Sequence, residues 1–317
     1  MSRSSTSKSV EMESSDLVDE CMARDDACSQ RYDECYNFYN KGMIYAAHQL
    51  MLKNIDNALD LGGRQSRLYE AIKRDHTLVF STSAVMKAAE KWTESVVSNK
   101  CRGVDDSIKN FASKSSAIDH LIEGQIDAGS FPLITLASRL EFADAWIGAI
   151  SESKFVRQLS GNSHVVCLTV TNPVLSYLGG KVVYVRIDTF DNTLFDQTYI
   201  VILTPLTTAQ CRKLKIGDAR YVANSRFFAF SAVTFLFSSV SFPALESANT
   251  NVKIYVENMQ VVRYAPIYLN NLACVDLFAK MCKIWANTAR QVGDMLYEGE
   301  RLEKIVSFME KSSRFQQ

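Results

Sequence analysis

The sequence carries no net charge that would direct it to a charged partner. Its 317 residues include 35 lysines and arginines and 35 aspartates and glutamates. A neutral chain has no overall field that draws it to nucleic acid or to an anionic membrane. Any binding of that kind must come from a local patch of charge.

Also missing are the short motifs in which a residue spacing implies a chemistry. The chain contains no HExxH, CxxC, GxSxG, GxGxxG or GxxxxGK(S/T) motif, and none of its four histidines has a second histidine at metal-ligand spacing. Two carboxylate pairs, Asp105 with Asp106 and Asp188 with Asp191, have no supporting motif and are expected at the surface. The sequence therefore predicts no catalytic residue, no metal and no cofactor. It predicts a protein that is not an enzyme, and an unrecognised enzyme is the remaining alternative.

The N-terminus lacks the apolar segment that a secretory signal contains. Residues 1–15, MSRSSTSKSVEMESS, are polar and rich in serine, which predicts a disordered tail. Eight cysteines occur without a compact disulfide framework, which favours a reducing compartment. We therefore expect an intracellular protein that is not secreted and is at most peripheral to a membrane. If it is viral, we expect it in the host cytoplasm or at cell junctions.

Three of the cysteines, Cys21, Cys28 and Cys35, lie seven residues apart. Two turns of one straight helix separate neighbouring members by about 10.5 Å, beyond the reach of a disulfide or a shared zinc ion. We expect these cysteines to form a seam that docks on another surface. Metal or redox chemistry between molecules is the alternative.

One long uncharged run, Phe227–Leu245, decides between a membrane span and a buried part of a sheet. As a helix it would extend roughly 28 Å, close to the ~30 Å thickness of the hydrocarbon layer. The run contains six phenylalanines and no isoleucine, and Val233, Phe235 and Phe237 partly alternate with other residues. Alternating aromatic and β-branched residues are typical of a strand. We interpret the run as a strand pair inside a sheet.

Four further runs are strand-like: His164–Thr171, Lys181–Asp188, Tyr199–Thr204 and Asn251–Val262. Their hairpin-like spacing predicts an α+β fold that contains an antiparallel, jelly-roll-like β-sandwich.

Apolar residues at helical spacing fill the chain before this predicted sandwich. They predict a helix around Met43–Leu50 and two more over Val104–Ile126 and Leu133–Ile150. The predicted organisation is a disordered tail (1–15), a helical region (16–153), a β-sandwich domain (154–266) and a C-terminal amphipathic helix (267–317).

The predicted C-terminal helix carries a broad apolar stripe. One position recurs every seven residues and is occupied by Cys274, Met281, Thr288, Met295, Leu302 and Met309. Trp285 lies on the same side of the helix. Such a stripe packs against another part of the chain or against a second copy. The first interpretation places it on the helical region. The second makes it a self-association surface formed by Met281, Trp285, Met295, Leu302 and Met309.

A basic loop is the one local charge patch that stands out. The residues CRKLKIGDARYVANSR hold five basic side chains, Arg212, Lys213, Lys215, Arg220 and Arg226, against the single Asp218. Lysine and arginine bind phosphates without reading sequence, and Tyr221 offers a face on which a base can stack. The loop is a candidate single-stranded nucleic-acid site, and a solvated loop is the alternative.

The stretch CLTVTNPVLSYLGGKVVYVRID resembles the core of the plant-virus cell-to-cell movement proteins of the thirty-kilodalton superfamily. In that family an apolar strand is followed by a strand that begins after glycine and ends in a characteristic aspartate. The resemblance implies that Asp188 is this aspartate, within a jelly-roll-like sandwich. It also implies a movement protein that binds single-stranded nucleic acid and associates with itself.

The order of helices, sandwich and helices is similar to the middle-layer capsid proteins of double-stranded RNA viruses, which is an analogy of fold alone. A virion structural protein with a helical base and a projecting sandwich is therefore the alternative function. Both interpretations predict a homo-oligomer, with host or viral proteins as further partners.

Overall fold

The computed structural model describes residues 31–55, 63–90, 92, 108–112, 119–171, 181–216, 230–238, 249–259 and 267–297. The chain separates into two compact units, Met1–Thr77 and Leu78–Gln317. The expected boundaries at 153/154 and 266/267 separate elements within the second unit, so this division does not test them, and they stay a prediction.

The first unit is helical where it is described. Residues 31–40 form a helix, and α2 (Ile44–Ile55) follows as the spacing around Met43–Leu50 predicts. The helix α3 (Gly63–Ala89) begins in this unit. A buried apolar set that includes Ile44 and Ile72 lies between these helices, and the Tyr39 hydroxyl donates a 2.7 Å hydrogen bond to Asp75. Cys35 is buried, whereas Cys21 and Cys28 lie outside the described residues.

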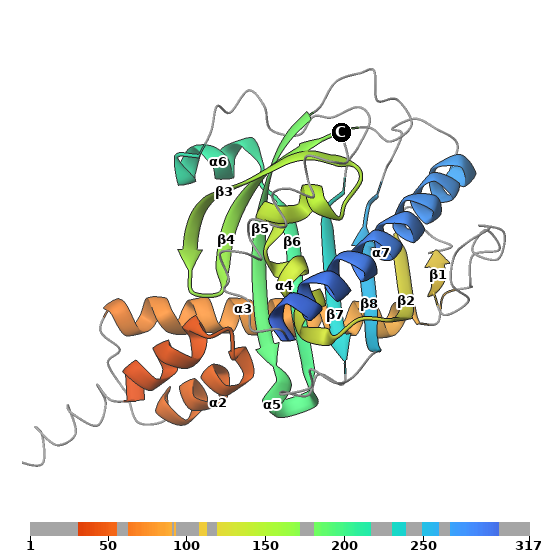
Figure 1. Cartoon of the computed structure of the whole chain (residues 1–317). Helices are drawn as coiled ribbons and strands as arrows, with labels where there is room; N and C mark the ends of the chain where they lie inside the picture. The colour runs from red at the N-terminus through yellow and green to blue at the C-terminus, as the bar shows by residue number, and fades with distance from the viewer. Residues whose placement is uncertain are drawn as a thin grey trace, which may run out of the picture. The chain divides into compact units, whose positions relative to one another are not determined.

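The second unit is built on one antiparallel sheet (Figure 1). Its strands, in chain order, are β1 (Ile108–Ala112), β2 (His120–Ile126), β3 (Ile150–Ser160), β4 (Ser163–Val170), β5 (Lys181–Asn192), β6 (Thr198–Pro205), β7 (Ala232–Ser238) and β8 (Thr250–Glu257). They are arranged β1-β2-β8-β7-β6-β5-β4-β3. The α+β class is confirmed. The sandwich is wrong for the described residues, because their strands pair edge to edge in a single layer.

Helices cover one side of the sheet, which we call the inner face. The helix α7 (Ile267–Tyr297) crosses it, and α4 (Ser130–Ser138) lies beside α7 on the same face (Figure 1). A short 3₁₀ segment, η2 (Leu140–Ala145), links α4 to β3. The main hydrophobic core therefore lies between the inner face and these helices, where α7 takes the place that a second sheet has in a sandwich.

Smaller elements complete this unit. The four-residue α5 (Thr193–Asp196) turns the chain from β5 to β6, and α6 (Thr208–Leu214) follows β6. On the other face of the sheet, Met86 and Ala89 at the end of α3 pack against Leu121 and Tyr255. Within the described ranges, no helix combines the length and apolar character needed to cross a bilayer.

The five predicted strands meet different outcomes. Those at His164–Thr171, Lys181–Asp188 and Tyr199–Thr204 are confirmed as β4, β5 and β6. The one at Asn251–Val262 is confirmed as far as Glu257, where β8 ends, and its last residues, 260–262, lie outside the described residues. In the phenylalanine-rich run, β7 occupies Ala232–Ser238 as expected, and the second strand of the predicted pair falls outside the described residues.

The helix predicted over Val104–Ile126 is wrong, because β1 and β2 form there. Both sides of β2 are buried: Leu121 faces the end of α3, while Ile122 and Ile126 face the core. A strand covered on both faces shows no alternation of apolar and polar residues, so its spacing can imitate that of a helix. The helix predicted over Leu133–Ile150 exists only in part, because α4 ends at Ser138 and β3 begins at Ile150.

Candidate functional site

An apolar cavity lies between the inner face of the sheet and α7. Its volume is about 80 Å³, and all fifteen side chains that line it are hydrophobic. The sheet contributes residues from β3 to β7, including Val185, Leu203 and Phe235, and Leu140 of η2 lies at its wall. Most of its lining residues belong to the main core of this unit.

The cover of the cavity comes from α7. Leu277, Phe278 and Met281 line it, and positions i, i+1 and i+4 of a helix share one side. The adjoining loop residues Ile147 and Ala149, which precede β3, also line it. We call Leu277, Phe278 and Met281 the lid residues, because an occupant that needs more room must displace them or the sheet.

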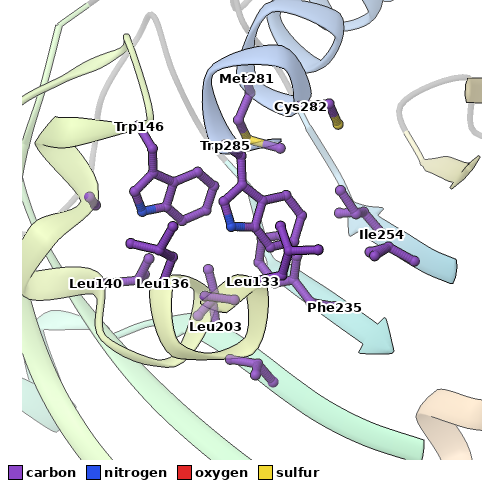
Figure 2. Packing of buried hydrophobic residues seen from close by; sticks show 14 of the residues in the cluster. Leu133, Leu136, Leu140, Trp146, Leu203, Phe235, Ile254, Met281, Cys282 and Trp285 are labelled. Carbon is purple, nitrogen blue, oxygen red and sulfur yellow. The ribbon is translucent and has the colours of Figure 1, made fainter. Parts of the chain in front are cut away.

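An aromatic cluster borders the cavity. Trp146 and Trp285 stack with ring centroids 5.1 Å apart and planes 23° apart. Phe235, which also lines the cavity, packs edge-on against Trp285 at 5.4 Å. Figure 2 shows the two indoles side by side, with Leu136 and Leu140 below Trp146 and Met281 above Trp285. These large rings fix the distance between α7 and the sheet next to the cavity.

The chemistry of the cavity is that of hydrocarbon. No ionisable side chain is among its lining residues, and a charged group would lose its hydration there without gaining a partner. Cys282, next to the lid residue Met281, is buried, and burial raises the pKa of its thiol to about 12. The thiol therefore stays neutral at physiological pH. In the described residues, no group of three or more His, Cys, Asp or Glu side chains is placed to hold a metal ion.

The predicted basic loop is only partly described. Arg212 and Lys213 lie in the last turn of α6, and Lys215 caps that helix in a left-handed conformation. Arg220, Tyr221 and Arg226 lie outside the described residues. The side of α6 that packs inward does so through Cys211, which contacts Val165 and Leu206. The described basic residues therefore belong to a short helix that is anchored on the sheet.

Asp188 is buried in β5, with 2% of its surface exposed. Its Oδ1 accepts hydrogen bonds from Nε and Nη2 of Arg186, at 2.9 and 2.6 Å. Asp188 pairs with Ile202 of β6 and Ser163 of β4 in the sheet register. The aspartate thus forms a buried ion pair on a central strand.

The predicted self-association stripe is used inside the chain where it is described. Met281 and Trp285 are buried in the main core, against the sheet. Met295 lies in α7, and Leu302 and Met309 lie outside the described residues. The stripe therefore does pack within the chain. Its described partners are the sheet and α4 of the second unit, and α4 lies within the expected helical region, residues 16–153.

Sequence reasoning missed the cavity and most of its lining. Leu140, Ile147 and Ala149 were assigned to a helix that does not continue through them. The one available signal was the apolar stripe of α7, which includes Phe278 and Met281. The stripe indicated that another surface buries this side of α7, but it did not indicate which surface.

Comparison with known proteins gives similarity in structure alone. No protein-family model matches the chain, and no curated protein matches it. Human STARD10 is similar with a TM-score of 0.48 and 13% identity, over 69% of this chain and 82% of that one. Human StAR-related lipid transfer protein 5 follows with a TM-score of 0.44 and 9% identity, over 68% and 98%. A STAR-related lipid transfer protein fragment from Xanthomonas axonopodis gives 0.43 and 10%, over 63% and 98%.

These findings correct the viral interpretations. The similar structures are START and lipid transfer proteins rather than movement proteins, and the described strands form one helix-covered sheet rather than a jelly roll. The assignments as a movement protein and as a capsid protein are therefore wrong. The expected partners, single-stranded nucleic acid, other copies of the chain, and host or viral proteins, lose their support together with those assignments.

Proposed function

We propose that this protein binds an apolar or amphipathic small molecule of the lipid class beneath α7, as a binding protein rather than an enzyme. The observation that carries this proposal is the cavity of about 80 Å³ with a wholly hydrophobic lining. A dry apolar void takes up apolar ligands because they restore contacts that its walls lack.

Energy favours occupation. An empty cavity costs roughly 24 cal/mol per Å³, so about 2 kcal/mol for this volume. An acyl chain that enters recovers this cost and adds about 0.8 kcal/mol for each methylene group removed from water. The cavity is about half the size of the ~150 Å³ void that holds benzene in an engineered protein. A lipid chain therefore requires the lid residues to move.

The lid is suited to such movement. Met281 has an unbranched, flexible side chain that adapts to irregular space, and Leu277 is only partly buried. Two of the similar structures are named lipid transfer proteins. That name agrees with the ligand class, but the likeness is too distant to carry the proposal.

The experiment measures binding of a fluorescent fatty acid by the purified full chain, with and without the cavity. Ala149→Leu adds a branched side chain to a buried lining residue and fills the void. Ala88→Leu makes the same change at an exposed position of α3 and is the matched control. We expect Ala149→Leu to weaken binding at least tenfold, about 1.4 kcal/mol, without lowering stability.

Two results would overturn the proposal. One is a wild-type protein that binds none of a series of fatty acids and sterols. The other is an Ala149→Leu protein that binds them as tightly as the wild type and the Ala88→Leu control do.

A further inference from the structure

A second hollow lies at the opposite end of the strands from the apolar cavity. Its volume is about 560 Å³, and its lining includes Arg139, Glu141, Phe155, Asn162 and His164. We call it the polar cleft. Leu140 lines the apolar cavity while its two neighbours in sequence line the polar cleft. One short segment thus separates two compartments of different polarity.

The floor of the polar cleft holds buried polar atoms that have no hydrogen-bond partner in the described part of the chain. They are Nδ2 of Asn162, Nε2 of His164 and Oε2 of Glu141. Asn162 and His164 are 3% and 9% exposed. The His164 and Glu141 atoms are 4.0 Å apart, too far for a direct hydrogen bond. Native proteins satisfy nearly all such groups, so these three atoms are available to hydrogen-bond an occupant of the polar cleft.

The floor of the polar cleft contains both hydrogen-bond donors and hydrogen-bond acceptors. The Asn162 amide is oriented by Ser160, whose Oγ donates a 2.7 Å hydrogen bond to Oδ1, which leaves Nδ2 as a donor. The Glu141 carboxylate only accepts. Burial lowers the pKa of His164, so its ring is neutral at physiological pH and has one donor and one acceptor nitrogen. An occupant must therefore donate and accept at neighbouring positions, and hydroxyl groups do both.

The charges of the polar cleft favour a neutral occupant. Arg139 donates from Nε to Oε1 of Glu141, so the positive and negative side chains neutralise each other. An anion bound at the floor would face the carboxylate of Glu141, and a cation would face the guanidinium of Arg139. Because the pair presents both signs, the attraction of an ion to one member is offset by its repulsion from the other. Neither an anion nor a cation is therefore strongly favoured, and a ligand without charge loses no ionic hydration on binding.

An aromatic ring lies beside this floor. Phe155 is 52% exposed, which is unusual for so large an apolar side chain. Its ring stacks on His164 with centroids 6.0 Å apart and planes 26° apart. The negative face of an aromatic ring attracts the weakly positive C–H groups of a saturated ring. A ring with hydroxyl groups at its edge and C–H groups on its face matches both surfaces.

We propose that the polar cleft binds a neutral polyhydroxylated ring, a pyranose sugar or a cyclitol. Phe155 is the platform for the C–H face of this ring. Glu141, Asn162 and His164 bind its hydroxyl groups. The site is separate from the apolar cavity, and a free sugar and the head-group of a glycolipid offer the same chemistry.

The test uses saturation-transfer NMR and titration calorimetry on the full chain. The probes are the methyl pyranosides of glucose, galactose and mannose, and myo-inositol; glycine betaine, a zwitterion, and inorganic phosphate, an anion, are the comparisons that carry charged groups. We expect at least one polyol to bind and neither charged compound to compete with it. Binding of phosphate or betaine in place of all four polyols would overturn the proposed ligand class.

Variants locate the binding. Phe155→Ala is expected to weaken polyol binding about 3- to 10-fold, the size of one aromatic contact, and Glu141→Gln by about tenfold, since a charge-assisted hydrogen bond becomes neutral. Phe131→Ala removes a ring that is 46% exposed and lies outside the polar cleft, so it should leave binding unchanged. Polyol binding that survives both Phe155→Ala and Glu141→Gln would overturn the location.

A second arm identifies the source of the ring. Vesicles with and without a galactosyl lipid are sedimented with wild-type and Phe155→Ala protein. Sedimentation that needs both the galactosyl lipid and Phe155 assigns a glycolipid head-group, while binding of free methyl pyranosides alone assigns a free sugar. Fatty-acid binding in the apolar cavity should be unchanged in Phe155→Ala, so failure of one proposal is distinguishable from failure of the other.

Discussion

Replacing Trp285 with alanine should destabilise the sheet unit by about 4 kcal/mol. Trp285 has no exposed surface and lies at the centre of the contact between α7 and the inner face. Removal of a fully buried aromatic side chain costs roughly 3–5 kcal/mol, because apolar burial is lost and a cavity remains. Trp285 also contacts the rings of Trp146, Phe235 and Phe237. Each such pair contributes about 0.5–1.5 kcal/mol beyond its area, so the upper part of the range applies.

Trp285→Phe separates the ring from its polar group. The indole Nε1 of Trp285 is buried without a hydrogen-bond partner among the described residues. Such a buried donor costs about 1–3 kcal/mol, and phenylalanine removes it while keeping much of the ring. The packing lost with the smaller ring destabilises the fold, and removal of the unpaired indole N–H stabilises it, so the two contributions offset each other. We therefore expect Trp285→Phe to change stability by less than about 1.5 kcal/mol, a conclusion that the ring contacts alone would not give.

The assay is urea unfolding of the full chain with hydrogen exchange of α7 peptides as the readout, which reports the sheet unit separately. Trp92→Ala is the matched control, since Trp92 is partly buried and its ring lies 6.1 Å from that of Tyr255. It should cost about 1–2 kcal/mol. The reasoning about packing fails if Trp285→Ala costs no more than this control. The reasoning about the unpaired N–H fails if Trp285→Phe costs as much as Trp285→Ala.

Three further outcomes follow from buried or paired groups. Asp188→Asn should cost about 3 kcal/mol in urea unfolding, because it leaves the partly buried Arg186 without its charged partner; a loss below 1 kcal/mol, roughly that of a surface pair, would contradict this. Burial lowers the pKa of His120 to about 4. Between about pH 6.5 and pH 4, His120 is therefore protonated in the unfolded chain and neutral in the folded chain. The free energy of unfolding falls as the pH falls through that window. His120→Leu should reduce the difference between the free energies of unfolding at pH 7 and pH 4 by roughly 3 kcal/mol. An unchanged pH dependence would show that His120 is not the group responsible. Cys282 should resist iodoacetamide at pH 8 in the folded protein, as mass spectrometry of its peptide can show, because its thiolate is scarce; rapid alkylation would mean that the core is open.

The strands of the sheet could be predicted where one side is apolar or both sides are β-branched. Lys181–Asp188 and Tyr199–Thr204 contain local patterns that no tertiary contact has to supply, and β5 and β6 form there. In contrast, β2 is sandwiched between the end of α3 and the core, so its apolar residues fall on both sides and the pattern disappears. Local spacing thus fails for β2, whereas β6, which is also buried on both faces, is recognised by its run of β-branched residues.

The number of layers could not be predicted from the strands. An apolar strand face requires a cover, and a second sheet or a helix satisfies it equally. The information lay in α7, whose stripe of Met281 and Trp285 needed a partner just as the sheet did. Pairing the apolar stripe of α7 with the apolar face of the sheet would have predicted the helix-covered sheet. An apolar stripe, however, shows only which side of a helix is buried and not which surface buries it.

The inner face of the sheet changes from polar to apolar along its strands, and this change separates the two proposed sites. On β4, His164 lies at the polar cleft and Val170 at the apolar cavity. On β5, Thr189 lies at the polar cleft and Val185 at the apolar cavity. The two strands run in opposite directions, so the change reads from polar to apolar in one and from apolar to polar in the other. The sequence of β4 or of β5 alone does not show this change in polarity, because outward-facing residues alternate with inward-facing ones along each strand. Only the register that pairs His164 with Ile187 brings the polar ends together. A slip of one of these strands by one residue would turn its inner row outward and remove its residues from both sites, so the register that holds the core also holds the division between them.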